Sequence, residues 1–317
     1  MLMCQGAFRK FLIKLLYAFL KYVIIKNIKY LKLGETKMRE IDVTQITAAI
    51  KELCIKANCC LNSDVYSALE KAKAEETSEI GKNILSQLIE NADLAECKMK
   101  PICQDTGMAV IFMEIGQEVH FTGGSLTDAI NEGVRQGYTE GYLRKSVVSD
   151  PLIRVNTKDN TPAIIHYDIV EGDKVHIEVA PKGFGSENMS RVYMLKPSDG
   201  IEGVKNAIID CIKKAGPNPC PPMVVGVGIG GNFEMCTKLA KKALLRPIGS
   251  KSDKEHIREM EEELLIRANN LGIGPQGLGG NTTILGLNIE TYATHIAGLP
   301  LAINISCHVT RHGEVTI

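Results

Sequence analysis

The early part of the chain carries apolar residues at helical spacing. They recur every three or four positions in residues 41–73, and again in residues 78–90. This period places them on one face of a helix, so both segments are predicted to be helical. The run 108–115 is short, continuous and rich in branched residues, which predicts a strand. Ser125, with an acid three residues later, is typical of a helix start and predicts a helix over 125–142.

Strands and helices are interleaved in the rest of the chain. Two branched segments flank the turn 171–173, and this pattern predicts a hairpin within 161–182. The other predicted elements are a helix in 201–216 closed by Gly216, a strand, glycine loop and helix in 217–245, a charged helix in 252–270, and two strands joined by a loop in 281–312. The fold class predicted is mixed α and β, with a helical N-terminal part followed by an α/β domain.

The first 37 residues form a basic, apolar segment with no acid before Glu35. Lysines interrupt it too often for the roughly 18 uncharged residues of a membrane-spanning helix, and no signal-peptide cleavage site is evident. Two interpretations stay open. The segment is a basic amphipathic surface helix, or it is an extension upstream of a natural start at Met38. We favour the second, which divides the chain into 1–37 and a catalytic domain at 38–317.

Composition narrows the class of protein. The chain has 317 residues and an apolar share of 44%, enough to bury a sizeable core. Basic and acidic residues both count 37 and there is no Trp, so a nucleic-acid partner is not expected. Ten cysteines without a secretory signal indicate a reducing cytoplasm, with some cysteines binding metal.

Three cysteines differ from the others in their local context. Most of the rest lie in segments predicted to be helical and are interpreted as inert core thiols: Cys4, Cys54, Cys59, Cys60, Cys97 and Cys236. Cys103 opens the strand at 108–115 in "KPICQDTG", Cys220 lies between prolines in "PNPCPPM", and Cys307 ends the last strand in "NISCH". Turn and strand-end positions let a side chain point out of the core.

A set of three cysteines suggests a particular metal chemistry. Cysteine followed by proline is common among iron–sulfur ligands. Three ligands leave one iron of a cubane cluster open, and an open metal can act as a Lewis acid. No close CxxC pair is present, so local context alone favours three inert thiols. Zinc held by the three cysteines and His308 is the competing metal site.

Glycine-rich segments raise two further possibilities. Gly226, Gly228 and Gly231 fit GxGxxG after a strand, but only Asp253 loosely supplies the acid of a dinucleotide site. A tight loop that brings the backbone close to another segment is the favoured interpretation, and a nicotinamide-dependent oxidoreductase is a distant alternative. The loops 183–188 and 272–283 could offer backbone amides to an anion or serve only as turns.

Together the motifs resemble a known family. "PICQDTG", "NPCPPMVVGVGIGG", "KLAKKALLRPIG", "GIGPQGLGGNTT" and "LPLAINISCH" are similar, in order, to the alpha subunit of the iron–sulfur hydro-lyases, the class I fumarase and L-tartrate dehydratase family. The resemblance extends from about residue 41 to 312, and it makes the α/β part an iron–sulfur domain. It implies a [4Fe–4S] cluster on Cys103, Cys220 and Cys307, with hydration or dehydration at the fourth iron.

The resemblance also implies a function and residue roles. We expect a fumarate hydratase alpha subunit that interconverts fumarate and L-malate. L-tartrate dehydratase is the alternative in the same class, and a non-enzymatic iron–sulfur or zinc partner-binding module is the alternative in another. Asp105 and His295, which lies on the loop before the last strand, are expected to move a proton. Gln104, Arg144 and Gly185 are expected to contact the carboxylates of a small dicarboxylate substrate.

The resemblance finally implies a second chain. Single-chain members carry a further domain beyond the third cysteine, whereas this sequence ends soon after Cys307. A beta subunit is therefore expected to complete the pocket and to supply the base at C3, in a dimer of alpha–beta pairs. The face that it covers should be more apolar or more cationic than an ordinary surface.

Overall fold

The computed structural model describes residues 16–22 and 38–317. Residues 16–22 are helical and exposed, and the remainder of the segment 1–37 lies outside the described residues. Among the helices described, none combines the length and apolar character needed to cross a membrane. The division at residue 38 stays a prediction.

The first large sheet has the strand order β10-β5-β2-β4. β2 is central and is buried on both faces, because Ala109 and Ile111 face one core cluster while Val110 and Phe112 face another. The strands are β2 (Met108–Gly116), β4 (Ile164–Val170), β5 (Val175–Lys182) and β10 (Gly313–Thr316). The predicted strand at 108–115 is therefore confirmed.

The predicted hairpin is wrong, although both of its strands exist. β2 lies between them, parallel to β4 and antiparallel to β5. The turn after β4 passes around the end of β2, where the amides of Gly116, Gln117 and Glu118 donate to carbonyls of Lys174, Val170 and Gly172 at 2.8–3.0 Å. A turn and two branched strands look the same locally whether or not a third strand lies between them.

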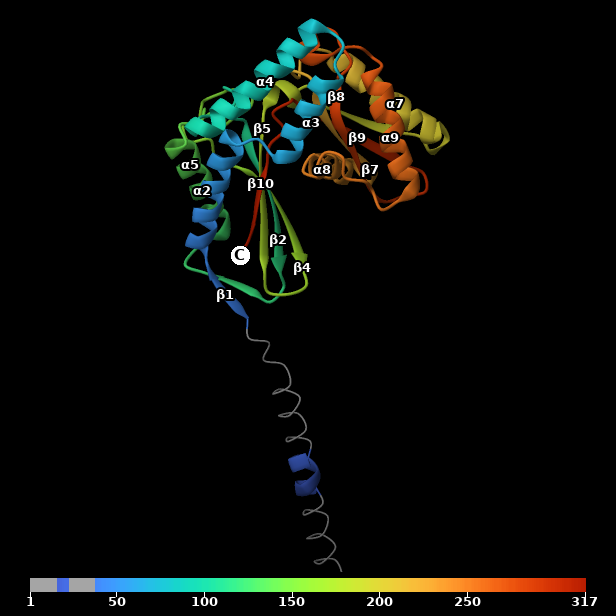
Figure 1. Cartoon of the computed structure of the whole chain (residues 1–317). Helices are drawn as coiled ribbons and strands as arrows, with labels where there is room; N and C mark the ends of the chain where they lie inside the picture. The colour runs from blue at the N-terminus through green and yellow to red at the C-terminus, as the bar shows by residue number, and fades with distance from the viewer. Residues whose placement is uncertain (1–15, 23–37) are drawn as a thin grey trace, which may run out of the picture.

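Two helices cover the outer face of this sheet, as Figure 1 shows. They are α2 (Val43–Cys59) and α5 (Leu126–Glu140). They approach closely because α5 presents glycines: a Cβ at Gly133 would lie 2.7 Å from the Thr47 carbonyl oxygen. The Ser125 side chain accepts from the Asp128 amide, which confirms the predicted helix start. A short parallel pair, β1 (Arg39–Asp42) with β3 (Val119–Thr122), lies beside them.

The long helix predicted over 41–73 is broken at residues 60–62. It continues as α3 (Ser63–Glu75), followed by α4 (Glu79–Lys98), which crosses the top of the molecule in Figure 1. Cys54 and Cys59 are buried as predicted, but Cys97 is exposed and Cys60 is half-buried. Cys4 lies outside the described residues. The inert-core interpretation therefore holds only in part.

The second large sheet has the order β6-β9-β7-β8. Helices α7 and α9 cover its outer face, and α8 lies between the two large sheets (Figure 1). The elements are α6 (Phe184–Glu187), β6 (Arg191–Leu195), α7 (Gly200–Ala215), β7 (Met223–Gly231), α8 (Phe233–Ala243), α9 (Glu255–Asn269), β8 (Ile284–Thr294) and β9 (Leu299–Ser306), with short 3-10 turns at Pro197–Asp199 and Pro275–Gly277. This layered arrangement confirms the mixed α and β class.

The glycines of "VGVGIGG" serve packing. They belong to strand β7, whereas a glycine loop was predicted. Val225 and Val227 face the core beneath α7 and α9, while Gly226 and Gly228 face α8. A Cβ at Gly226 would lie 2.2 Å from the Ala240 carbonyl oxygen, and one at Gly228 would lie 2.1 Å from that of Cys236. The glycines let the helix backbone touch the strand, so close backbone approach was the correct interpretation.

Substituting Gly228 with alanine should destabilise the fold. The new methyl group would overlap the α8 backbone, and overpacking of this kind costs about 1–3 kcal/mol. Urea unfolding measures the loss. G298A is the matched control, because its Cβ would have its nearest neighbours at 3.8 Å. Equal stability of G228A and G298A would contradict this account of the packing.

Stability should also fall in mild acid through His312. Its pKa is lowered from 6.5 mainly by burial, and its Nδ1 is buried without a hydrogen-bond partner among the described residues. The unfolded chain therefore binds the proton more readily, and the free energy of unfolding should decrease as pH falls below about 6.5. The charged groups that act on it are Asp64, Glu178, Glu314 and Lys242.

The measurement is urea unfolding of wild type and H312Q at pH 7.5 and pH 5.5. H312Q should lose less stability on acidification than wild type. H120Q, which alters an exposed histidine on β3, is the control and should follow wild type. Parallel pH dependence in wild type and H312Q would refute the role of His312.

Candidate active site

The sheet topology brings the three predicted cysteines to neighbouring strand ends. Cys103 precedes β2, Cys220 precedes β7 and Cys307 follows β9. β7 and β9 are antiparallel, with Val224 opposite Ser306, so the start of one strand meets the end of the other. Two of the cysteines therefore belong to the second large sheet and one to the first.

The three thiols are close enough to influence one another. Burial raises the pKa of Cys220, and the neighbouring Cys307 and Cys103 raise it further. Burial likewise raises the pKa of Cys307, while Arg311 acts in the opposite direction and Cys103 adds to the rise. Cys220 is exposed, and the other two are partly exposed. The thiols thus converge on a region that opens to solvent.

The three thiols do not have the close spacing of a single-ion site. One zinc ion about 2.3 Å from each sulfur needs sulfurs within about 4.6 Å of one another. Among the described residues, the only three candidate ligands that lie within 4.8 Å of one another are His176, Glu178 and Glu314, and Glu178 is paired with Lys242. Wider-spaced sulfurs suit a group that offers each cysteine its own iron.

Backbone contacts fix Cys220 in place. Its φ of +54° is unusual for a residue with a side chain. Its amide donates to the Pro217 carbonyl at 3.1 Å, and its own carbonyl bonds to Nδ1 of His308 at 3.0 Å. The competing zinc ligand is therefore engaged with backbone through this nitrogen. Gln276 holds the next carbonyl, that of Pro221, through its amide and its side chain.

The carboxylate of Asp105 is held by backbone amides. Its Oδ1 accepts from the Gly107 amide at 3.2 Å, and its Oδ2 accepts from the Phe184 amide at 2.8 Å and from the Gly185 amide at 3.5 Å. The predicted substrate contact at Gly185 therefore lies beside Asp105, with its amide directed at that side chain. A Cβ at Gly185 would meet only open space, so this side of the turn is accessible.

Cys103 and Gln104 lie beside Asp105 on the same segment. The Asp105 amide lies 3.4 Å from the Cys103 sulfur, and that sulfur lies 3.4 Å from Oε1 of Gln104. Gln104 itself is exposed and can turn toward a ligand.

The backbone of Arg144 is hydrogen-bonded to the segment that carries Cys103, Gln104 and Asp105. Its carbonyl accepts from the Thr106 hydroxyl at 3.1 Å. Buried Asn160 joins the two segments, because it donates to the Gly107 carbonyl and accepts from the amides of Ser146 and Val147. The guanidinium of Arg144 is exposed and makes no ion pair with any described residue, so it is available to an anion.

Sequence reasoning missed two buried cations at this site. Arg311 donates to the Asp105 carbonyl and lowers the pKa of Cys307. Lys182 is buried beside the Gly183–Glu187 turn, where burial lowers its pKa to about 8. In the sequence, Lys182 is marked only by its position just before the glycine loop. Arg311 is marked only by its position four residues after Cys307. Neither signal indicates burial.

His295 is not brought to this site within the chain. It lies on the loop before β9, whereas Cys307 follows the far end of the same strand. Eight residues of strand at about 3.3 Å each separate the two by roughly 25 Å. His295 is exposed, and its Nδ1 accepts from the Ala297 amide at 3.2 Å. β9 connects the two residues and places them at opposite ends of the sheet.

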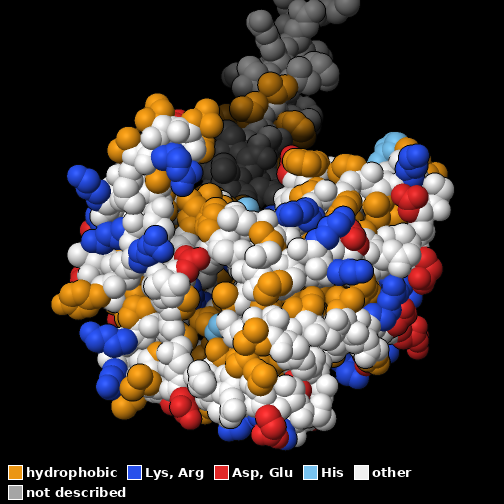
Figure 2. Space-filling view, turned by 90° about the horizontal axis from the view of Figure 1, so that it is seen from above, with side chains coloured by type: hydrophobic (Ala, Val, Ile, Leu, Met, Phe, Trp, Pro, Cys, Tyr) orange, Lys and Arg blue, Asp and Glu red, His pale blue; other side chains and the backbone are white. Residues whose placement is uncertain are grey.

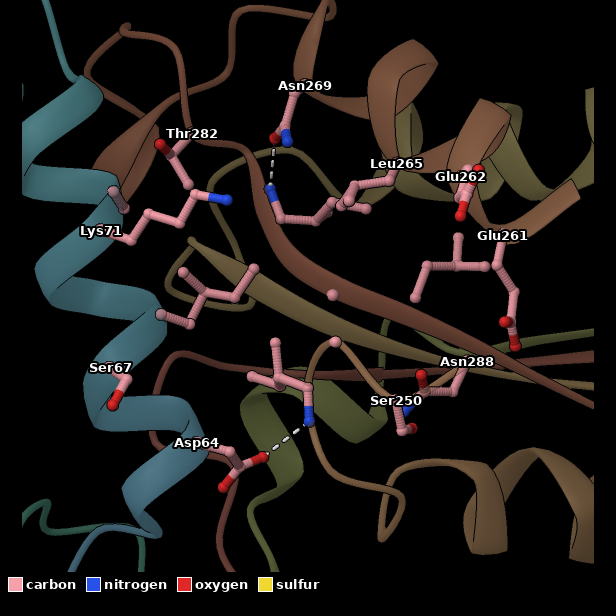
Figure 3. Close-up of a pocket in the computed structure, with 18 of the residues that line it drawn as sticks. Asp64, Ser67, Lys71, Ser250, Glu261, Glu262, Leu265, Asn269, Thr282 and Asn288 are labelled. Atoms are coloured by element: carbon pink, nitrogen blue, oxygen red, sulfur yellow. Dashed lines mark hydrogen bonds between the residues drawn. The ribbon is translucent and has the colours of Figure 1, made fainter. Parts of the chain in front are cut away.

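A separate groove of about 520 Å³ lies between α3 and α9, with β8 between them (Figure 3). It contains none of the predicted site residues. Several of its charged side chains are paired, as in Lys71 with Glu75 and Lys251 with Glu262. Asp64 accepts from the Ile248 amide at 2.7 Å. The groove therefore lacks the convergent reactive groups found at the cysteines.

The surface beside the site is apolar and basic. The 142–158 loop exposes Tyr142 (83%), Leu152 (89%), Ile153 (76%) and Val155 (58%). Its basic residues are Arg144, Lys145, Arg154 and Lys158. Lys100 stacks over the Tyr142 ring at 5.4 Å, which links the loop to the segment before Cys103. Patches of apolar side chains interspersed with Lys and Arg are visible in Figure 2.

Known proteins share this arrangement of motifs. A family model described as fumarate hydratase (Fumerase) matches residues 47–316. The "Putative L(+)-tartrate dehydratase subunit alpha" of Methanocaldococcus jannaschii is 45% identical over 273 residues, which cover 84% of this chain and 95% of that protein. The L(+)-tartrate dehydratase subunit alpha of Escherichia coli K12 is 33% identical over 279 residues, covering 87% and 91%. The chain therefore belongs to the fumarate hydratase (Fumerase) family, among the alpha subunits of the iron–sulfur hydro-lyases.

Proposed function

We propose that this chain is the alpha subunit of a hydro-lyase that interconverts fumarate and L-malate with a [4Fe–4S] cluster. The observation that carries the proposal is the convergence of Cys103, Cys220 and Cys307 beside the amide-held carboxylate of Asp105. Three sulfur donors too widely spaced for one ion fit a cluster with one iron left free of protein ligands. A bound cluster would supply a Lewis acid for a hydroxyl group.

The chain's own residues would bind and orient the substrate. Arg144 offers an unpaired guanidinium that can grip a carboxylate with two parallel hydrogen bonds. Gln104 adds an amide beside Cys103. Thr106 and Asn160 tie both segments together, so the backbones that carry the two groups are held close to each other. Binding a dicarboxylate at both ends would place its hydroxyl-bearing carbon beside Asp105.

Asp105, in its protonated form, would donate a proton to the departing hydroxyl, which then leaves as water. A general acid must lie within hydrogen-bonding reach of the atom that it protonates, and Asp105 is two residues after Cys103 in the sequence. Its carboxylate is held at both oxygens, so its direction is set before substrate binds. His295 could join Asp105 only from another copy of the chain, which agrees with the proposed dimer of alpha–beta pairs.

A beta subunit would close the pocket. The three cysteines are wholly or partly exposed, and the 142–158 loop beside them carries exposed apolar and basic side chains. Such a surface is expected where a partner docks. The partner would exclude water and supply the base at C3. The proposed location in the cytoplasm follows from the use of cysteine.

L(+)-tartrate is the second candidate substrate, and the names of the relatives favour it. Tartrate differs from malate by one hydroxyl group at C3. A site that hydrogen-bonds this group would discriminate strongly against malate, because its own polar groups would otherwise stay unpaired. The residues that read this hydroxyl could lie on the beta subunit.

An assay of substrates tests the proposal directly. Anaerobic co-expression with the beta subunit should give a complex that dehydrates L-malate and hydrates fumarate. L(+)-tartrate and D-tartrate are assayed in parallel, with kcat/KM as the measure. A preference for L(+)-tartrate would replace fumarate by the second candidate. Inactivity on all four substrates, with one zinc and no sulfide bound, would favour the partner-binding module.

Two substitutions should separate cluster binding from proton transfer. C103S should lower the iron and sulfide content and abolish turnover, while the circular dichroism spectrum stays that of wild type. D105N should keep the iron content and absorbance of the cluster and lose about 100-fold or more in kcat. C97S, at an exposed cysteine to which no role in the site is assigned, is the control and should behave as wild type. Full activity of C103S, or unchanged kcat of D105N, would reject the corresponding role.

A further inference from the structure

We propose that buried Lys182 is a positioning residue that aims Asp105 by holding the Gly183–Glu187 turn. The inference rests on the proposed function only for its kinetic consequence. The arrangement itself is a chain of contacts from Lys182 to the turn, and from the turn to the Asp105 carboxylate.

Lys182 makes its contacts almost entirely with this turn. Its Nζ donates to the Ser186 hydroxyl at 2.8 Å and to the Gly183 carbonyl at 3.3 Å. It also lies 3.2 Å from Oε2 of Glu187. The side chain is only 5% exposed, so these contacts are sheltered from competition by water. All three partners fall within five consecutive residues.

The Gly183–Glu187 turn holds Asp105. Helix α6 is a single turn of four residues, which is too short to be stable by itself. Its first amides, those of Phe184 and Gly185, donate to Oδ2 of Asp105. The turn lies close to that carboxylate, because a Cβ at Gly183 would be 3.0 Å from the same oxygen. Any loosening of the turn would therefore move the donors that aim Asp105.

Lys182 does more here than neutralise Glu187. Glu187 already pairs with Lys241 at 2.5 Å and accepts from Asn304 at 3.0 Å. Lys241 lies on α8 and, within the described part of the chain, donates to Glu187 but to no other residue of the turn. Removing either cation leaves Glu187 with the other. Only removal of Lys182 takes a buried donor away from the Gly183 carbonyl and the Ser186 hydroxyl. These two groups would then keep only the turn's own hydrogen bonds, from Ser186 and from the Glu187 amide to the Gly183 carbonyl.

This difference supplies a matched pair of variants. K182M and K241M each replace a largely buried lysine paired with Glu187 by an apolar side chain of similar length. Both are made in the assembled alpha–beta enzyme, and melting temperature and iron content are recorded for each. K182R restores the charge and part of the hydrogen bonding.

We expect K182M to lower kcat by about tenfold to a hundredfold, as small misplacements of a catalytic group do, with KM within about twofold of wild type. K241M should keep kcat within about threefold even where its melting temperature falls as far. K182R should recover part of kcat. Equal losses of kcat in K182M and K241M would reduce Lys182 to a structural role and overturn the proposal.

Hydrogen exchange gives a readout that does not depend on activity. The amides of residues 184–188 should exchange faster in K182M than in wild type or K241M. S186A removes the hydroxyl that Lys182 contacts, together with the bond from that hydroxyl to the Gly183 carbonyl. It gives a milder version of the same change if K182M does not fold. Unchanged exchange in both K182M and S186A would refute the link to the turn. Inactivity of the wild-type complex would instead count against the proposed function.

Discussion

The site depends on a buried ionic bridge between the two large sheets. Glu187, on the turn after β5, pairs with Lys182 of the first sheet and with Lys241 of α8, which packs on the second sheet. Asn304 of β9 donates to the same carboxylate. Buried charges cost several kcal/mol each unless paired and hydrogen-bonded, so this cluster tolerates one arrangement of the two sheets and penalises others. The cluster contributes more to fixing the relative position of the two sheets than to the net stability of the fold.

That placement decides whether the cysteines form one site. Cys103 is attached to the first sheet, and Cys220 and Cys307 to the second. A shift of one sheet against the other would separate the ligands even with both sheets intact. The bridge also contains two cations and one acid, so it leaves a positive surplus near the sulfurs. Lys182 accordingly lowers the pKa of Cys307 against the larger effect of burial, which favours the thiolate that a metal requires.

The sequence predicted the helices and strands better than it predicted which of them lie side by side. Helical period and branched runs located most helices and strands, since these signals come from which face of a segment is buried. Sheet order depends on contacts between distant segments, and the insertion of β2 between β4 and β5 left no local mark. The glycines of β7 were misassigned to a loop for a related reason. A glycine that admits a helix backbone, as Gly228 does, looks the same in a sequence as one that allows a turn.

The residues of the candidate site likewise divide into those that the local sequence identifies and those that depend on the fold. Motifs identified Cys103, Gln104 and Asp105, because polar groups at a strand mouth need a reason to be there. The position of His295 depended on the direction of β9, because this strand places His295 and Cys307 at opposite ends of the second large sheet. Lys182 could not have been identified, because its face of β5 alternates like a solvated one, with His176 and Glu178 at the preceding even positions. Lys242 of α8 pairs with Glu178 on that face. Complementary charge on two elements far apart in sequence therefore makes a polar strand face part of the interior, and only the fold reveals the pairing.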